Sequence, residues 1–161
     1  MGLFKDYVSQ TRKPEGFLGK MMVNGMNGGH AKMADWGMSH LTKTKPEEIL
    51  EIGCGGGRNA GELLKKYPSS HVTAIETIYF WPGLKECFQQ VAKVLKPGGI
   101  FMIVNESDGT DKVSLKFEKI IDGMKCHTVE EIEEALRNAG FSKIKSDHHK
   151  SKPWIIIIAK K

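Results

Sequence analysis

The sequence has few of the features that mark secreted, metal-binding or membrane-spanning proteins. Its three cysteines, Cys54, Cys87 and Cys126, are widely spaced among 161 residues and odd in number, which matches neither a disulfide framework nor a zinc site. No apolar run approaches the ~20 residues of a transmembrane helix, and the N-terminus lacks an apolar signal region. We therefore expect a protein of the reducing cytoplasm, with no metal site and no membrane partner.

A strong excess of one charge is also missing. The formal net charge is +5, and Lys and Arg are scattered, with only short clusters such as Lys160-Lys161. Nucleic-acid binding requires a basic patch, so this pattern favours a solvated surface instead. The 40% hydrophobic and 27% charged composition is typical of a soluble globular protein, and the length is that of one domain.

What the sequence does contain is a buried strand that runs into a series of glycines. Residues 49–57 read Ile-Leu-Glu-Ile-Gly-Cys-Gly-Gly-Gly, and a predicted helix begins at Arg58. Such a strand, turn and helix can present backbone N–H groups to a nucleotide-like ligand; the alternative is a plain tight turn. Glu76 follows Gly57 by 19 positions, from 57 to 76. This is close to the ~20-residue spacing of a carboxylate that binds a ribose, although a solvated strand-end carboxylate is the alternative.

Hydrophobic periodicity predicts alternating strands and helices along the chain. Strands are expected at 47–53, 71–78, 100–104, 142–148 and 154–160, and helices at 15–26, 30–42, 58–67, 82–96, 112–124 and 128–139. Residues 112–124 also fit a strand, but we favour a helix; the helix at 128 opens with a capping box, Thr128 to Glu131. The last two strands are joined by a short link and must be antiparallel. The fold class is therefore α/β, a reduced doubly wound Rossmann-like sheet of about five strands, mostly parallel with an antiparallel C-terminal pair.

These motifs resemble those of class I S-adenosylmethionine-dependent methyltransferases of the small-molecule type. Residues 51–57 look like the first motif of that family, and Lys96-Pro97-Gly98-Gly99 looks like the turn before its fifth strand. The segment 16–36 is similar to the N-terminal lid of some members. The resemblance implies a helical lid over residues 1–45 and a Rossmann-like core over residues 46–161. It also implies an enzyme that transfers a methyl group from S-adenosyl-L-methionine to a small-molecule acceptor.

The same resemblance implies a cofactor site built around the glycine run. Its expected members are Glu51, Gly53, Cys54, Gly55, Gly57, Arg58, Glu76 and Thr77. Glu76 is expected to bind the ribose hydroxyls, and Arg58 either neutralises the methionine carboxylate of the cofactor or forms a surface ion pair.

Three residues are candidates for a catalytic role. His30 in the lid can act as a general base, or it is a surface histidine. Tyr79 can place its ring against the sulfonium, or it packs in the core. Asn105, together with its neighbour Glu106, ends a strand on the ligand side of the sheet, where the two contact substrate or cap a turn.

One departure from the family pattern is large. Family members place a helix, a strand and another helix between the ribose-binding acid and the fourth strand. Here residues 72–76 read like the end of the second strand and residues 76–81 like the end of the fourth, so the two are spliced into one. Parallel crossovers are right-handed in about 98% of cases. We therefore expect this spliced strand in the second-strand position, which lies on one side of the first strand, with the strand at 100–104 on the other side. The fourth-strand position and an exchange of elements between two chains are the alternatives.

A shortened sheet has a consequence for assembly and for activity. It exposes apolar flanks, so we expect a homodimer. The alternative to an enzyme is a non-catalytic remnant of the fold that acts as a cofactor-binding or dimerising protein.

Overall fold

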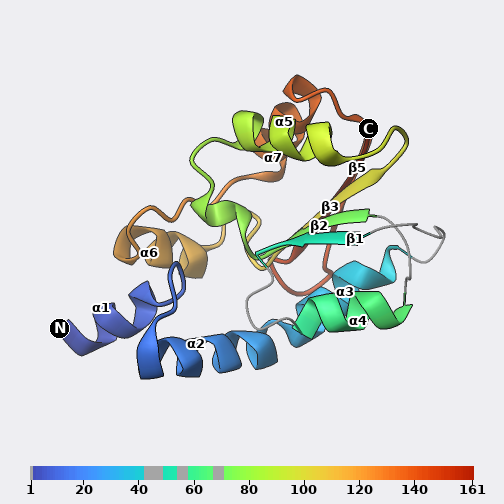
Figure 1. Ribbon diagram of the computed structural model, residues 1–161. Helices are drawn as coiled ribbons and strands as arrows, with labels where there is room; N and C mark the ends of the chain where they lie inside the picture. The colour runs from blue at the N-terminus through green and yellow to red at the C-terminus, as the bar shows by residue number, and fades with distance from the viewer. Residues whose placement is uncertain (1, 42–48, 54–57, 67–70) are drawn as a thin grey trace.

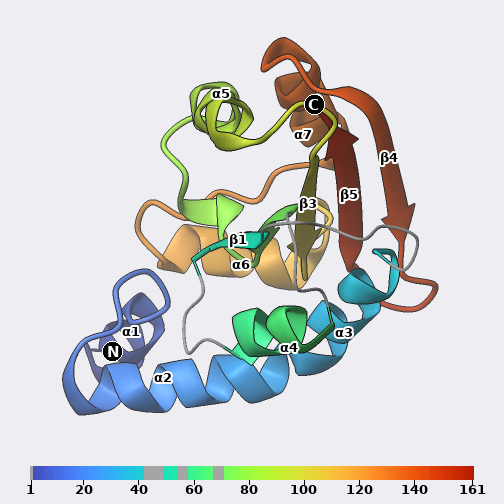
Figure 2. The same ribbon diagram turned by 45° about the vertical axis from the view of Figure 1, so that its right-hand side comes forward.

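A computed structural model describes residues 2–41, 49–53, 58–66 and 71–161 of the protein. Helices and strands alternate, and helices cover both faces of one sheet (Figures 1 and 2). The helices are α1 (Gly2–Ser9), α2 (Gly16–Gly29), α3 (Ala31–Ser39), α4 (Arg58–Lys66), α5 (Leu84–Val94), α6 (Lys112–Ile120) and α7 (Val129–Asn138), with a short 3-10 helix, η1 (Ile78–Phe80). The strands are β1 (Ile49–Ile52), β2 (His71–Ile75), β3 (Ile100–Asn105), β4 (Ser142–His148) and β5 (Ile155–Lys160).

The five strands form one mixed sheet in the order β1-β2-β3-β5-β4. The pairs β1–β2 and β2–β3 are parallel, whereas β5 runs antiparallel to both β3 and β4. The predicted fold class is therefore confirmed, including the antiparallel C-terminal pair. The ambiguous segment after residue 112 is a helix, α6, as expected.

Two apolar clusters hold the sheet between its helices. On one face α5 and α7 cover the sheet with a cluster that includes Phe88, Phe101 and Leu136. On the other face α3 and α4 pack Met33 and Leu63 against it. Because β3 is covered on both faces, its run of Ile, Phe, Met, Ile and Val is continuous rather than alternating.

Local sequence signals fix the ends of α7. The capping box is present: Glu131 donates its backbone N–H to the Thr128 hydroxyl, and the Glu131 carboxylate accepts from the Thr128 N–H. Gly140 follows the helix with φ +92°, the left-handed conformation that favours glycine after a helix.

The expected position of the spliced strand is wrong. β2 lies between β1 and β3, which is the fourth-strand position, and not on the far side of β1. The chain thus steps in one direction from β1 to β2 to β3, while α4 and α5 cover opposite faces of the sheet (Figures 1 and 2). Two crossovers that step the same way over opposite faces have opposite hands, so one departs from the right-handed rule.

The reason lies in the demands of burial. Two right-handed crossovers that step in the same direction would place both helices on one face of the sheet, where they would crowd each other. The structure avoids this by placing α4 beside α3, where Leu63 shares the apolar cluster with Met33. Burial of apolar side chains on both faces of the sheet therefore outweighs the right-handed preference of one crossover.

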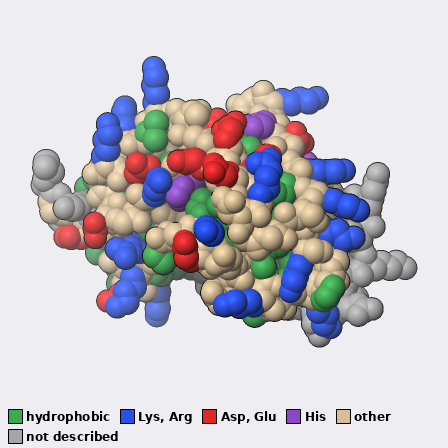
Figure 3. All heavy atoms as spheres, turned by 90° about the horizontal axis from the view of Figure 1, so that it is seen from above, with side chains coloured by type: hydrophobic (Ala, Val, Ile, Leu, Met, Phe, Trp, Pro, Cys, Tyr) green, Lys and Arg blue, Asp and Glu red, His purple; other side chains and the backbone are tan. Residues whose placement is uncertain are grey.

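The remaining differences from the sequence analysis are smaller. The strand expected to end at residue 78 stops at Ile75 and is followed by η1, and α1 lies where no helix was expected. None of the described helices is long and apolar enough to cross a membrane. Figure 3 looks down on the face that carries α5 and α7 and shows Lys and Arg spread around its rim, with acidic side chains between them.

Candidate functional site

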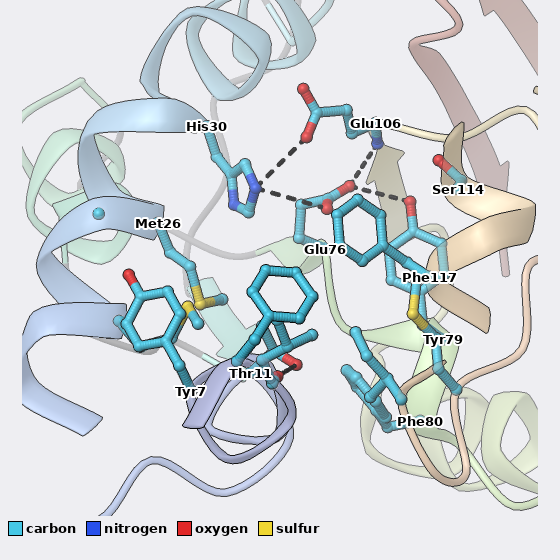
Figure 4. A pocket seen from close by; sticks show the side chains of 16 residues that line it. Tyr7, Thr11, Met26, His30, Glu76, Tyr79, Phe80, Glu106, Ser114 and Phe117 are labelled. Atoms are coloured by element: carbon cyan, nitrogen blue, oxygen red, sulfur yellow. Dashed lines mark hydrogen bonds and ion pairs between the residues drawn. The ribbon is translucent and has the colours of Figure 1, made fainter. Parts of the chain in front are cut away.

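A cavity of about 410 Å³ lies at the carboxyl ends of β2 and β3, where α1, α2, α6 and η1 meet (Figures 1 and 4). In open parallel sheets ligands bind at the carboxyl ends of the strands. The wall of the cavity is mostly apolar and carries aromatic rings and methionines; among its members are Phe4, Tyr7, Met26, Phe80, Phe117 and Met124. Its polar end is formed by His30, Glu76, Tyr79 and Glu106.

Glu76 is the residue around which the polar end is built. It directly follows β2 and has φ +58°, a conformation that is uncommon outside glycine and often found at functional sites. Its backbone N–H donates to the Val104 carbonyl at 2.9 Å. This turn directs the carboxylate toward the end of β3, where Oε1 accepts from the Tyr79 hydroxyl at 3.1 Å and from the backbone N–H of Glu106.

His30 joins the two glutamates from the other side of the cavity. It lies between α2 and α3, and its Nε2 is 3.4 Å from Glu106 Oε2 and 3.8 Å from Glu76 Oε2 (Figure 4). One ligand atom from each of the three residues lies within 4.8 Å of the others, close enough for all three to face one small cation. His30, a candidate from the sequence, is therefore only partly exposed and has two acidic neighbours.

Burial and charge shift the proton affinities of these groups in different directions. Burial raises the pKa of Glu76 to about 7, against the opposing effect of the positive charge on His30. Burial lowers the pKa of His30, but its hydrogen bond to Glu106 and the charges of both glutamates outweigh this and raise it overall. The hydrogen bond from His30 lowers the pKa of Glu106. The cavity therefore holds a carboxyl group that exchanges its proton near neutral pH, as a general acid or base requires.

Tyr79 forms a hydrogen bond that holds Glu76 in place. Its buried hydroxyl donates to Glu76 and accepts from the backbone N–H of Ser107 at 3.0 Å. Burial, followed by the charge of Glu76, raises the pKa of Tyr79 well above its ordinary value. The side chain is thus a hydrogen-bond donor that orients Glu76, and it lines the cavity at the same time.

The expected cofactor loop is only partly described. Gly53 follows β1 with φ +73°, and a Cβ at this position would come within 2.3 Å of the Thr77 side chain. Thr77 Oγ1 is buried and has no hydrogen-bond partner among the described residues. Cys54, Gly55 and Gly57 lie outside the described residues. The positive φ and the close Thr77 side chain both require glycine at position 53. The observation that fits a polar ligand is the buried Thr77 hydroxyl, which has no partner among the described residues.

Other predicted site residues have partners or surroundings of their own. The Arg58 guanidinium donates to Asp35 at 3.0 and 3.1 Å, so it forms the ion pair that was the alternative to cofactor binding. Asn105 is fully buried, and neither polar atom of its side chain has a hydrogen-bond partner within the described ranges. Glu51 lies within β1, half-buried.

Sequence reasoning missed much of the cavity wall. Tyr7 and Phe4 belong to α1, for which no helix was predicted, and Phe117 belongs to a helix that was assigned without a role. Glu106 was not missed: it was expected with Asn105 at the end of a strand on the ligand side, and it lines the cavity.

Comparison with known proteins extends this description. Neither the protein-family models nor the curated proteins match the sequence. Solved structures do match its fold, at low sequence identity. One is a chain of the complex between the Haloferax volcanii Trm112 methyltransferase activator and a methyltransferase, with a TM-score of 0.76, 15% identity and coverage of 98% of this chain and 96% of that chain.

Two further structures show the same likeness. An O-methyltransferase from Nostoc punctiforme has a TM-score of 0.76 at 13% identity, over 98% of this chain and 68% of that chain. The Haemonchus contortus phosphoethanolamine N-methyltransferase 2, solved with S-adenosylhomocysteine, has a TM-score of 0.74 at 12% identity, over 98% of this chain and 60% of that chain.

The chain has the fold of the class I methyltransferases. Within this methyltransferase fold, β2 takes the fourth-strand place and β3 the fifth. The cavity therefore lies at the carboxyl ends of the fourth and fifth strands of the family pattern, and β1 forms one edge of the described sheet.

Proposed function

We propose that the protein is an S-adenosylmethionine-dependent methyltransferase and that the cavity receives its small-molecule acceptor. The observation that carries the proposal is the cavity itself. On a methyltransferase fold it places a buried carboxyl group, a histidine and a tyrosine at the carboxyl ends of two parallel strands. Methyl transfer from a sulfonium requires mainly placement and desolvation, to which the mostly apolar wall of the cavity contributes.

In this proposal the cofactor lies beside the glycine turn. Gly53 turns the chain there with positive φ, and the Thr77 hydroxyl, which has no partner among the described residues, supplies a polar contact. The acceptor then lies deeper, against Glu76 and Tyr79. Glu76 directs its carboxylate to Tyr79 and Glu106, so its role as a ribose ligand stays a prediction and its contribution to the acceptor cavity has the better geometric support.

Calorimetric titration with S-adenosylmethionine and S-adenosylhomocysteine tests the proposal. We expect binding that is lost when Gly55 is replaced by a bulky residue. The absence of heat at about millimolar ligand, an affinity worth about 4 kcal/mol, would rule out the enzyme. Binding that survives the replacement of Gly55 would place the cofactor elsewhere.

The rival function is a non-catalytic protein of this fold that binds the cofactor or acts by dimerising. It is favoured by the edge position of β1, since a ribose-binding acid on a strand beyond β1 is not among the described residues. Methyl transfer from labelled S-adenosylmethionine to a mixture of small-molecule acceptors distinguishes the two. Cofactor binding without transfer to any acceptor supports the rival.

We also propose that two copies of the chain associate through the β1 edge. There an apolar groove is lined by Ile52, Trp81, Pro82, Cys87, Gln90, Val91 and Val94. Nearby, Leu50 is 48% exposed and Val94 65% exposed. Exposed apolar surface beside an edge strand favours association, and light scattering should report a mass near twice 17.9 kDa.

A further inference from the structure

The cavity combines an acidic end with an aromatic wall. Glu76 and Glu106 lie together at one end, and Tyr7, Phe80 and Phe117 lie along the wall (Figure 4). Among the described residues that line it, none is Lys or Arg. Two carboxylates face the single histidine, His30, so this end of the cavity favours a cationic ligand over an anionic one.

We propose that the acceptor is a small organic amine with an apolar body, whose nitrogen lies between Glu76 and Glu106. The inference rests on the proposed methyltransferase function and names the substrate class of the same site. It rests on geometry: the carboxylates face one another across His30, and the apolar wall begins directly beside them.

The hydrogen bonds of Glu76 leave one oxygen for such a ligand. Within the described residues both hydrogen bonds to this carboxylate are made to Oε1, from Tyr79 and from the Glu106 N–H. The distance from Oε2 to His30 Nε2 is 3.8 Å, longer than a hydrogen bond. An ammonium group can therefore donate to Oε2 without displacing a protein donor.

The aromatic wall adds to the recognition of a cation. Ring faces attract a nearby ammonium group through their quadrupole, and an apolar ligand body removes the rings from water. Phe117 is 37% exposed and Phe4 62% exposed, so a bound amine has apolar surface to cover. An acid of the same shape would bring a third negative charge to the glutamates.

The chemistry of the proposed transfer balances. An alkylamine enters protonated, as a lysine side chain is at neutral pH, and it gives one N–H proton to the Glu76 carboxylate. The freed lone pair attacks the methyl carbon of the sulfonium; the N–C bond forms, the C–S bond breaks and its electron pair returns to sulfur. The products are a methylated ammonium ion, a thioether and protonated Glu76, which returns its proton to solvent.

Proton release on amine binding can be measured in addition to the affinity. The groups that face Glu76 are His30, Tyr79 and Glu106, and burial raises the pKa of Glu76 itself to about 7. An ammonium ion beside the carboxylate favours its charged form. Amine binding near neutral pH should therefore release protons, which appears as a binding heat that differs between buffers of different ionisation enthalpy.

The test uses three probes of similar shape on the protein without cofactor. Calorimetry should show that 2-phenylethylamine binds at least tenfold more tightly than 2-phenylethanol, and that 3-phenylpropionate does not bind. Equal affinity for the amine and the alcohol, or tighter binding of the acid, overturns the proposal. So does a titration in which Mg²⁺ or Zn²⁺ binds to the three residues and the amine does not.

Variants separate charge from shape. Glu76→Gln and Glu106→Gln should each weaken binding of the amine about tenfold, as for one hydrogen bond to a charged group, and leave binding of the alcohol unchanged. Phe117→Ala should weaken binding of both probes, because both lose apolar contact, and should weaken the amine somewhat more, because only the amine gains the attraction of the ring face. Val113→Ala, on the same helix but outside the cavity lining, is the matched control. If the glutamine variants weaken the alcohol as much as the amine, the carboxylates do not recognise the cation.

The test of amine binding and the test of S-adenosylmethionine binding can fail independently of each other. Amine binding without S-adenosylmethionine binding would leave the amine site standing and remove the enzyme. S-adenosylmethionine binding without amine binding would leave the enzyme standing with an acceptor of another class.

Discussion

The cavity beside α6 and the groove beside β1 are both hollows next to the parallel strands, yet their chemistry is opposite. The cavity gathers four polar groups, His30, Glu76, Tyr79 and Glu106, at the end of an apolar wall. The groove is apolar throughout except for Gln90. Buried charge is costly unless it binds something, whereas exposed apolar surface is removed by a protein partner. The comparison therefore assigns a small ligand to the cavity and a second chain to the groove.

The largest expected effect is at Gly53, which follows β1 and packs against Thr77. Replacing it with Val forces a side chain into positive φ and into Thr77, which should cost about 2 to 5 kcal/mol of unfolding free energy. Urea unfolding measures this cost. The control is Gly61→Ala within α4, where a Cβ has open space and a gain of about 0.5 to 1 kcal/mol is expected. A Gly53→Val protein as stable as the natural one would show that neither the positive φ nor the contact with Thr77 constrains this position.

The next effect concerns the charge that distinguishes the cavity. The pKa of Glu76 is about 7 in the folded protein, above its ordinary value of 4.5. The raised pKa of Glu76 therefore adds to the unfolding free energy below pH 4.5, and this stabilisation is lost as the pH rises toward about 7. The loss amounts to about 3 kcal/mol. Glu76→Gln removes the charge and should be more stable than the natural protein at about pH 8 but not at about pH 5.

His30 and Glu106 also contribute to the pH dependence of the unfolding free energy. The raised pKa of His30 contributes in the same direction, and the lowered pKa of Glu106 contributes in the opposite one. Comparing the slopes of unfolding free energy against pH for the natural protein and Glu76→Gln isolates Glu76. The exposed Glu134→Gln on α7 is the control. Parallel slopes for the natural protein and Glu76→Gln would contradict the buried-charge account.

A smaller effect separates the two roles of Arg58. Its ion pair with Asp35 is partly exposed, and such pairs contribute about 0 to 1 kcal/mol to stability. If Arg58 also holds the cofactor carboxylate, Arg58→Gln should weaken S-adenosylmethionine binding about tenfold, or 1.4 kcal/mol. Asp35→Asn, which frees the guanidinium, should not weaken it. If Arg58→Gln and Asp35→Asn bind S-adenosylmethionine with equal affinity in calorimetry, Arg58 does not hold the cofactor and its ion pair with Asp35 serves stability alone.

The smallest effect on stability tests the groove. Val94→Glu should change the unfolding free energy of the monomer by no more than about 0.5 kcal/mol, but it places a charge in the proposed contact. Val113→Glu is the matched control, because Val113 is 63% exposed and Val94 is 65% exposed, both on helices. In light scattering, Val94→Glu alone should fall to a mass near 17.9 kDa. If the natural protein already has that mass at high concentration, the dimer proposal is wrong.

Sequence reasoning was most successful where the signal is local. The capping box of α7 and the continuous apolar run of β3 depend on residues within one turn or one strand, and both are present. The antiparallel C-terminal pair followed from a link too short for a crossover. The helix α1, which carries the cavity-lining residues Phe4 and Tyr7, was missed because its residues give no clear boundary signal.

The sequence by itself determined the α/β class, the strand that leads into the glycines, and the presence of Glu76, Tyr79 and Asn105 near strand ends. Only the tertiary structure decided that β2 lies between β1 and β3, because the choice of a neighbouring strand depends on which arrangement buries apolar residues on both faces. It also decided that His30, Glu76 and Glu106 meet. These residues come from three separate segments, and their meeting depends on distant parts of the chain packing together, which local sequence pattern does not encode.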